Sequence, residues 1–172
     1  MQIVKKQDRQ ADFGPEDIRL FFIEHLNRIY CAKAHLVERL PEIRDNAEFE
    51  DLKYAIDETL DDVENQIARM DEIYSILNAE KAIQDFNGVI GLVEDAFTSI
   101  YHYRDNPSLR DMGILFYLQN IESLEMASFK VLMIVAAKFN DDKIKQLLKD
   151  NYNEAMADRA LLILILTRYV IK

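Results

Sequence analysis

The stretch 115-LFYLQNIESLEMASFKVLMIVA-136 decides the fold of this chain. Seven of its residues are spaced alternately three and four positions apart: Leu115, Leu118, Glu122, Glu125, Phe129, Leu132 and Ala136. That spacing predicts a long helix with one face packed against neighbouring helices. Glu122 and Glu125 lie on the packed face, so two carboxylates point inward and need cations, protons or hydrogen-bond donors from other helices.

Composition predicts an all-α protein with a single domain. The 172 residues include only four glycines and three prolines, and 49% are hydrophobic. This leaves little material for the turns of a β protein and enough apolar side chains for a substantial core.

Charge and cysteine content restrict the partners and the compartment. The chain has 31 acidic and 21 basic side chains and a net charge of -10, which disfavours nucleic acid as a partner. Its one cysteine, Cys31, excludes an internal disulfide and a Cys-rich metal site, so we expect a reduced, cytoplasmic protein. Residues 1–14 lack a signal-peptide core and are expected to form a flexible arm, and the apolar run 160–166 is too short to span a membrane.

Four long helices and one short helix are predicted between residue 15 and residue 172. Pro15 suits a first helical turn, and we expect the first helix to stop at Leu40 because Pro41 follows it. Asn46 is expected to cap a second helix that reaches about Leu77. The other helices are expected at about 87–103, 108–139 and 141–172. These lengths predict an antiparallel four-helix bundle with a short crossing helix between its second and third long helices.

Polar residues interrupt the inward face of every long helix near its middle. Lys33 occupies a position where the apolar spacing of the first helix predicts a leucine. We therefore expect its aliphatic stem in the core and its ammonium near a carboxylate. The predicted polar layer consists of Lys33, Thr59, Asp62, Gln66, Glu122, Glu125, Asn151, Glu154 and Asp158.

A polar layer inside a helical bundle is also how carboxylate-bridged dinuclear metal sites are built. Such sites use a Glu from each of two helices and a Glu-x-x-His motif from each of the other two. No Glu-x-x-His occurs here, because His25, His35 and His102 follow Phe22, Ala32 and Ser99 by three residues. The sequence therefore lacks the usual imidazole ligands.

Several segments resemble the ferritin-like YciE/YciF family of bacterial stress-associated proteins. The resemblance covers about residues 17–162 and is most specific in the first helix; its segments are 21-FFI-23, 29-IYCAK-33, 35-HLVERLP-41, 66-QIARM-70, 110-RD-111 and 121-IESLE-125. It implies a ferritin-like bundle, dimers and a dinuclear metal centre of poorly defined activity.

The chain departs from the family pattern at the positions that matter for a metal. Where the family carries acidic residues on the first helix, this chain has His25 and Lys33, and Thr59 stands in place of a family histidine. A family glutamate is replaced by Asp62, and the Glu-His-x-x-Glu motif reads 122-ESLE-125.

Two functional hypotheses follow. The first is a non-catalytic, metal-free protein in which Lys33 bridges to Glu122, Glu125 or Glu154 and which acts through an interaction surface. The second is a protein that binds Fe or Mn and oxidises Fe(II) or handles peroxide, with Asp62, Glu122, Glu125 and Glu154 as ligands. A single Mn, Fe or Zn ion is the intermediate case. The run 161–166 is apolar on all sides, for which we expect a homodimer contact, with packing of the short helix as the alternative.

Overall fold

The computed structural model describes residues 13–82 and 87–171, and within them the chain forms five α-helices and no β-strand. The helices are α1 (Pro15–Asn46), α2 (Glu50–Ile76), α3 (Asn87–His102), α4 (Pro107–Ala136) and α5 (Asp142–Val170). The all-α prediction is therefore confirmed. Of the predicted N-terminal arm, residues 1–12 lie outside the described residues.

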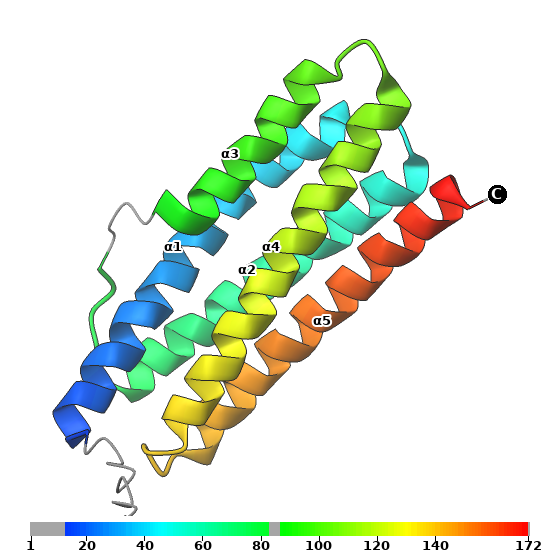
Figure 1. Cartoon of the computed structure of the whole chain (residues 1–172). Helices are drawn as coiled ribbons and strands as arrows, with labels where there is room; N and C mark the ends of the chain where they lie inside the picture. Colours follow the sequence, from blue (N-terminus) through cyan, green and yellow to red (C-terminus); the bar gives the residue numbers. More distant parts are fainter. Residues whose placement is uncertain (1–12, 83–86, 172) are drawn as a thin grey trace, which may run out of the picture.

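The four long helices form an antiparallel bundle. Around it, α1 contacts α2, α2 contacts α5, α5 contacts α4 and α4 contacts α1, and each neighbour runs in the opposite direction (Figure 1). The short helix α3 lies beside α1 and α4 at the end of the bundle where α2 begins. This confirms the ferritin-like bundle with one additional short helix. None of the helices in the described ranges is long and apolar enough to cross a membrane.

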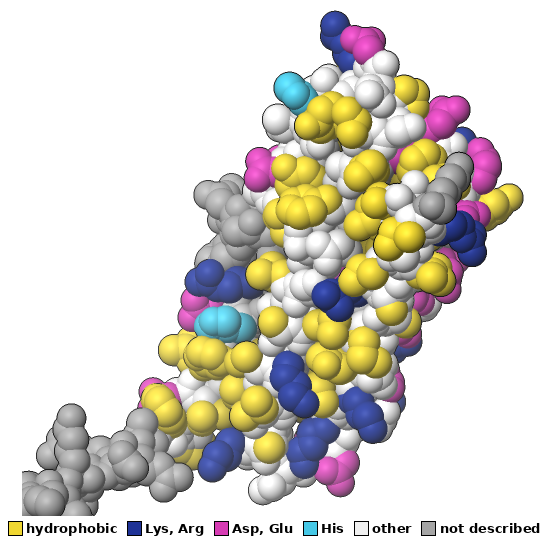
Figure 2. Space-filling view, turned by 45° about the vertical axis from the view of Figure 1, so that its right-hand side comes forward, with side chains coloured by type: hydrophobic (Ala, Val, Ile, Leu, Met, Phe, Trp, Pro, Cys, Tyr) yellow, Lys and Arg dark blue, Asp and Glu magenta, His cyan; other side chains and the backbone are white. Residues whose placement is uncertain are grey.

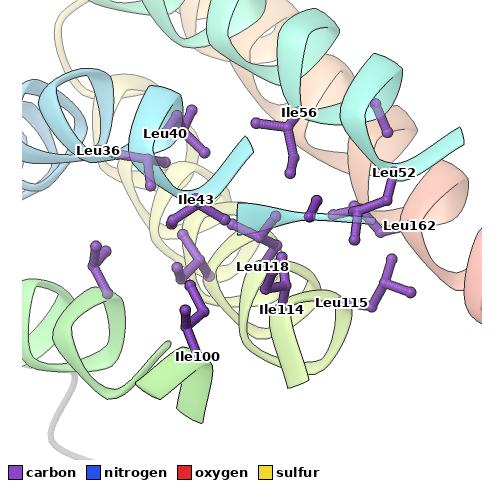
Figure 3. Close-up of a cluster of buried hydrophobic side chains, with 14 of the residues drawn as sticks. Leu36, Leu40, Ile43, Leu52, Ile56, Ile100, Ile114, Leu115, Leu118 and Leu162 are labelled. Atoms are coloured by element: carbon purple, nitrogen blue, oxygen red, sulfur yellow. The ribbon is translucent and has the colours of Figure 1, made fainter. Parts of the chain in front are cut away.

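Two apolar clusters fill the bundle at different heights. The Leu118 cluster lies near α3 and includes Leu36, Leu40, Ile56, Leu118 and Leu162 (Figure 3). The Phe129 cluster lies toward the opposite end and includes Phe22, Met70, Phe129 and Leu148. Every long helix contributes to both clusters, so burial of apolar surface holds each helix along most of its length.

The first helix does not stop at Leu40, as the sequence predicts, but continues to Asn46 with Pro41 inside it. Proline removes one helical hydrogen bond and costs about 3 kcal/mol in a helix interior. Here Leu40 and Ile43 flank it and are both 0% exposed, while Pro41 faces solvent. Burial of the flanking side chains in the Leu118 cluster outweighs the lost hydrogen bond.

The expected cap of the second helix is also wrong. Asn46 is the last residue of α1, and its Nδ2 donates to the carbonyl oxygen of Glu42. The α2 helix begins at Glu50, and the N-cap residue Phe49 has no side chain that could cap it. Asp111 of α4 performs this role instead: its Oδ2 accepts the backbone N–H of Glu48 at 2.8 Å and of Phe49 at 2.6 Å.

The last two helices begin as predicted. Asn106 Oδ1 accepts the N–H of Leu109 at the start of α4, and Asp141 Oδ1 accepts the N–H groups of Lys143 and Ile144 at the start of α5. The α4 helix ends at Ala136, three residues before the expected end. Gly113 lets α4 pack closely on α3: a Cβ there would lie 2.5 Å from Ser99 Oγ, so the Ser99 hydroxyl would have to move.

We predict that Asp111→Ala lowers the free energy of unfolding by about 2–3 kcal/mol, because two backbone N–H groups at the start of α2 lose their acceptor. Urea denaturation followed by circular dichroism measures the change. As a matched control, Asp105→Ala removes a carboxylate that is 92% exposed and should change stability by less than about 0.5 kcal/mol. Equal effects of the two substitutions would show that Asp111 does not cap α2.

Candidate functional site

A layer of polar side chains separates the two apolar clusters. On α1, Ile29 belongs to the Phe129 cluster and Leu36 to the Leu118 cluster, and Lys33 lies one turn from each. On α4, Glu122 and Glu125 follow Ile121 of one cluster and precede Phe129 of the other. The same alternation of apolar and polar segments occurs on α2 and α5.

Seven of the nine residues predicted for the layer are buried. Their exposed fractions are between 0% and 3% for Lys33, Thr59, Gln66, Glu122, Glu125, Asn151 and Asp158. The other two lie at the edge of the layer: Asp62 is partly buried, and the Glu154 side chain is 24% exposed. The helical spacing therefore placed the inward face correctly on all four long helices.

Lys33 forms a buried ion pair with Glu125. Its Nζ donates to Glu125 Oε2 and lies 5.6 Å from the centre of the Phe129 ring. The two side chains are 0% and 3% exposed, so neither charge is solvated by bulk water. Removing one partner of such a pair leaves the other charge uncompensated in a medium of low polarity. Lys33 and Glu125 thus depend on each other for their burial.

A second cation, Arg69 of α2, reaches the layer from its edge. Its guanidinium donates to both carboxylate oxygens of Glu154, at 2.5 and 2.6 Å, and also to Asn151 Oδ1 at 3.2 Å. The polar layer predicted from the sequence did not include this residue. The sequence contained two indications of this role. Arg69 follows Gln66 by three positions and so lies on the same side of the helix, and one lysine could not balance the five carboxylates of the layer.

Several buried polar atoms of the layer have no hydrogen-bond partner among the described residues. Buried oxygens without a hydrogen-bond partner include Glu122 Oε2, Glu125 Oε1, Asp158 Oδ2 and Thr59 Oγ1, and both polar atoms of the Gln66 side chain are also unpartnered. At Glu122 and Asp158, which form no ion pair with another described residue, such an environment favours the uncharged carboxyl group over a bare negative charge.

Burial raises the pKa values of Glu122, Asp158 and Asp62. The pKa of Glu122 lies well above its usual range, first because burial disfavours the charged form and then because Glu125 is close. Burial, followed by the negative charge of Asp62, raises the pKa of Asp158 to about 7. The pKa of Asp62 is also raised, by partial burial and by Glu154. Protons therefore supply part of the compensation that cations do not.

Within residues 13–82 and 87–171, no three His, Cys, Asp or Glu side chains are grouped so that they could hold a metal ion. His25 lies against the carbonyl oxygen of Phe21 and His35 against Glu94, both outside the layer. The ammonium of Lys33 repels a cation from the position beside Glu125.

Comparison with known proteins connects this arrangement to a family. A family model described as a domain of unknown function, DUF892, matches residues 17–171. Protein YciF of Escherichia coli K12 is 26% identical over 137 residues, which cover 79% of this chain and 82% of that protein.

Solved structures share the fold. The crystal structure of the E. coli stress protein YciF superposes with a TM-score of 0.85 at 26% identity, covering 90% of this chain and 98% of that one. YcfI of Rhodopseudomonas palustris gives a TM-score of 0.78 at 22% identity, covering 91% and 96% of the two chains. A protein from Xanthomonas campestris gives 0.68 at 16% identity, covering 90% and 94%. The family model covers nearly the whole bundle, and this chain therefore belongs to the DUF892 family.

Proposed function

We propose that this protein is a metal-free, non-catalytic member of its family, in which a salt-bridge network replaces a metal centre and function resides in an interaction surface. The observation that carries the proposal is the ion pair between Lys33 and Glu125 inside the bundle. Lys33 stands at a position where the family resemblance implies an acidic residue, so one substitution both removes a ligand and supplies a counter-charge.

The other charges of the layer support the same function. Arg69 engages both oxygens of Glu154 and so occupies a second carboxylate of the metal-ligand set. Glu122 and Asp158 hold protons more readily than ordinary carboxyl groups do, because their pKa values are raised. Two cations and these protons offset the negative charge without a metal ion. Buried ion pairs of this kind contribute little net stability, and their best-attested role is to fix the register of packed helices.

A second candidate is a di-iron or di-manganese protein that oxidises Fe(II) or handles peroxide. The observation that favours it is the pair of buried, unpartnered oxygens Glu122 Oε2 and Glu125 Oε1 on one helix. In this case Asp62, Glu122, Glu125 and Glu154 would supply the ligands. The single Mn, Fe or Zn ion is a variant of this candidate.

The proposed interaction surface is the outward face of α4, and its proposed occupant is a second copy of this chain. Six large apolar side chains are 36–66% exposed along that face, and they are Leu109, Met112, Phe116, Leu124, Val131 and Ile134. All carboxylates of α4 are buried, so its outward face carries none. Figure 2 shows hydrophobic side chains along the length of the molecule on this side, with Lys and Arg toward one end.

The size of this face suits a homodimer. From Leu109 to Ile134 an α-helix extends about 38 Å, so the apolar face runs along nearly the whole of α4. The run 161–166 is the smaller surface, because Leu162 and Ile165 are 1% and 3% exposed inside their own bundle. Burial within the chain accounts for part of its all-round apolarity.

The relatives suggest a setting for this role. YciF is described as a stress protein, and a structural role has been proposed for YcfI. We extend both descriptions to this chain, together with a cytoplasmic location, which its single cysteine favours.

Metal content tests the proposed function. Protein purified without chelator is expected to carry far less than one Fe, Mn or Zn ion per chain in elemental analysis, because Lys33 repels a cation from Glu125. Lys33→Glu should raise the metal content, whereas the control Lys53→Glu, which changes a lysine on the outside of α2, should not. Stoichiometric iron or manganese in the unmodified protein would refute the metal-free function and establish the second candidate.

The pH dependence of stability tests the state of Asp158. Its pKa is about 7 in the folded protein and 3.8 for an unperturbed aspartate side chain, so the folded state binds more protons between these values. The free energy of unfolding therefore falls as pH rises from about 4 to about 7. Asp158→Asn does not titrate, and we expect its loss of stability between about pH 5 and pH 8 to be smaller by roughly 2 kcal/mol.

Denaturant titrations at the two pH values measure this difference. Asp105→Asn is the control, because its carboxylate is 92% exposed. Parallel pH profiles for the unmodified protein and Asp158→Asn would show that Asp158 is ionised in the folded state throughout.

Sedimentation at micromolar concentration tests the homodimer. We expect a dimer mass for the unmodified protein and a monomer mass for Phe116→Glu, which introduces a charge into the centre of the apolar face. Leu20→Glu changes a residue of α1 that is 69% exposed and should leave the dimer intact. A monomeric unmodified protein would remove the proposed contact.

A further inference from the structure

A groove between α2 and α5 lies on a different side of the bundle from the outward face of α4. It has a volume of about 230 Å³. Tyr54, Leu161 and Leu164 give it an apolar lining, Asp51 and Glu58 are its acidic residues, and Arg168 is its one basic residue among the described residues. Tyr54 and Leu164 are 70% and 57% exposed, so the apolar lining is open to solvent.

The acidic residues of the groove on α2 are spaced along the helix axis, as an elongated ligand with separated charges would require. Asp51, Tyr54 and Glu58 are separated by three and four positions and therefore lie along one edge of the helix. The backbone rise between Asp51 and Glu58 is about 10 Å. Asp51 is paired with Arg168, which closes this end of the groove with a salt bridge on the surface.

Uncompensated negative charge collects at the other end of the groove. No side chain in the described ranges forms an ion pair with Glu58 or Asp61. Asp158, one turn before Leu161 on α5, is 3% exposed, and its Oδ2 has no hydrogen-bond partner. Glu58 lines the groove together with Leu161, which follows Asp158 by one helical turn on α5. Glu58 therefore presents an exposed carboxylate without a cation at this end of the groove.

The chemistry of this groove favours an organic cation over a metal ion. Its carboxyl groups are not grouped as metal ligands, as far as the described residues extend. An ammonium group, in contrast, donates hydrogen bonds to carboxylates at flexible spacing. Methylene groups attached to it would cover Leu161 and Leu164, and the Tyr54 ring would attract a second ammonium.

We infer that the α2–α5 groove binds a linear alkyl polyamine, with one ammonium at Glu58 and the carbon chain along Tyr54, Leu161 and Leu164. The second ammonium competes with Arg168 for Asp51. This site is independent of the proposed function, because none of these residues belongs to the metal-ligand set or to the face of α4. The -10 charge of the chain raises the local concentration of such a cation at low ionic strength.

Isothermal titration of the full chain with spermidine at low ionic strength tests the inference. We expect saturable binding of one spermidine per chain. Glu58→Gln should weaken it roughly tenfold or more, because a charge-assisted hydrogen bond is lost. Tyr54→Leu should weaken it about two- to fivefold, through loss of the ring. Arg168→Gln should strengthen binding, because Asp51 becomes available.

The matched control is Glu64→Gln, which removes the same charge from an exposed position on another face of α2. It should change the affinity by less than about twofold, since it affects only long-range attraction. Equal losses in Glu58→Gln and Glu64→Gln would overturn the inference by showing general counter-ion attraction. Displacement of spermidine by Mg²⁺ at equal ionic strength would also overturn it, as would binding of a lysine-rich helical peptide without saturable binding of spermidine.

Discussion

The ammonium of Lys33 and the carboxylate of Glu125 constrain the whole interior of the bundle. Both are buried between two apolar clusters, and each makes the burial of the other tolerable. The pair joins α1 to α4, which are neighbours in the bundle although α2 and α3 separate them along the chain. Sliding either helix by one turn would separate the charges inside an apolar medium. The ion pair therefore selects one register for the two halves of the chain.

Sequence periodicity predicted the fold and the inward faces because both depend on repeated local spacing. The positions of Lys33, Gln66, Glu122 and Asn151 follow from helical geometry alone. The pairing of these residues does not, since several carboxylates lie on facing helices at similar height. Arg69 illustrates the difference. Its position on α2 can be predicted from the sequence, but its pairing with Glu154 depends on how α2 and α5 are aligned.

Helix ends were less predictable for a related reason. Asn106 and Asp141 cap the helices that follow them, and such local caps can be read from neighbouring residues. Pro41 and Asn46 also carry local signals, yet the structure overrides both. Burial of Leu40 and Ile43 carries α1 through the proline, and a carboxylate more than sixty positions away caps α2. Local helix propensity predicts helix ends poorly where tertiary contacts contribute more free energy than the local signal does.

The cap from Asp111 also bears on how the chain folds as it leaves the ribosome. The α1–α2 hairpin is complete in sequence by residue 76, but the acceptor for its connecting turn and the partner of Lys33 both reside on α4. A nascent chain that ends before α4 therefore exposes an unneutralised ammonium and unpaired N–H groups. Native packing of the N-terminal half must wait for synthesis of the C-terminal half, so the bundle forms as one cooperative unit and not hairpin by hairpin.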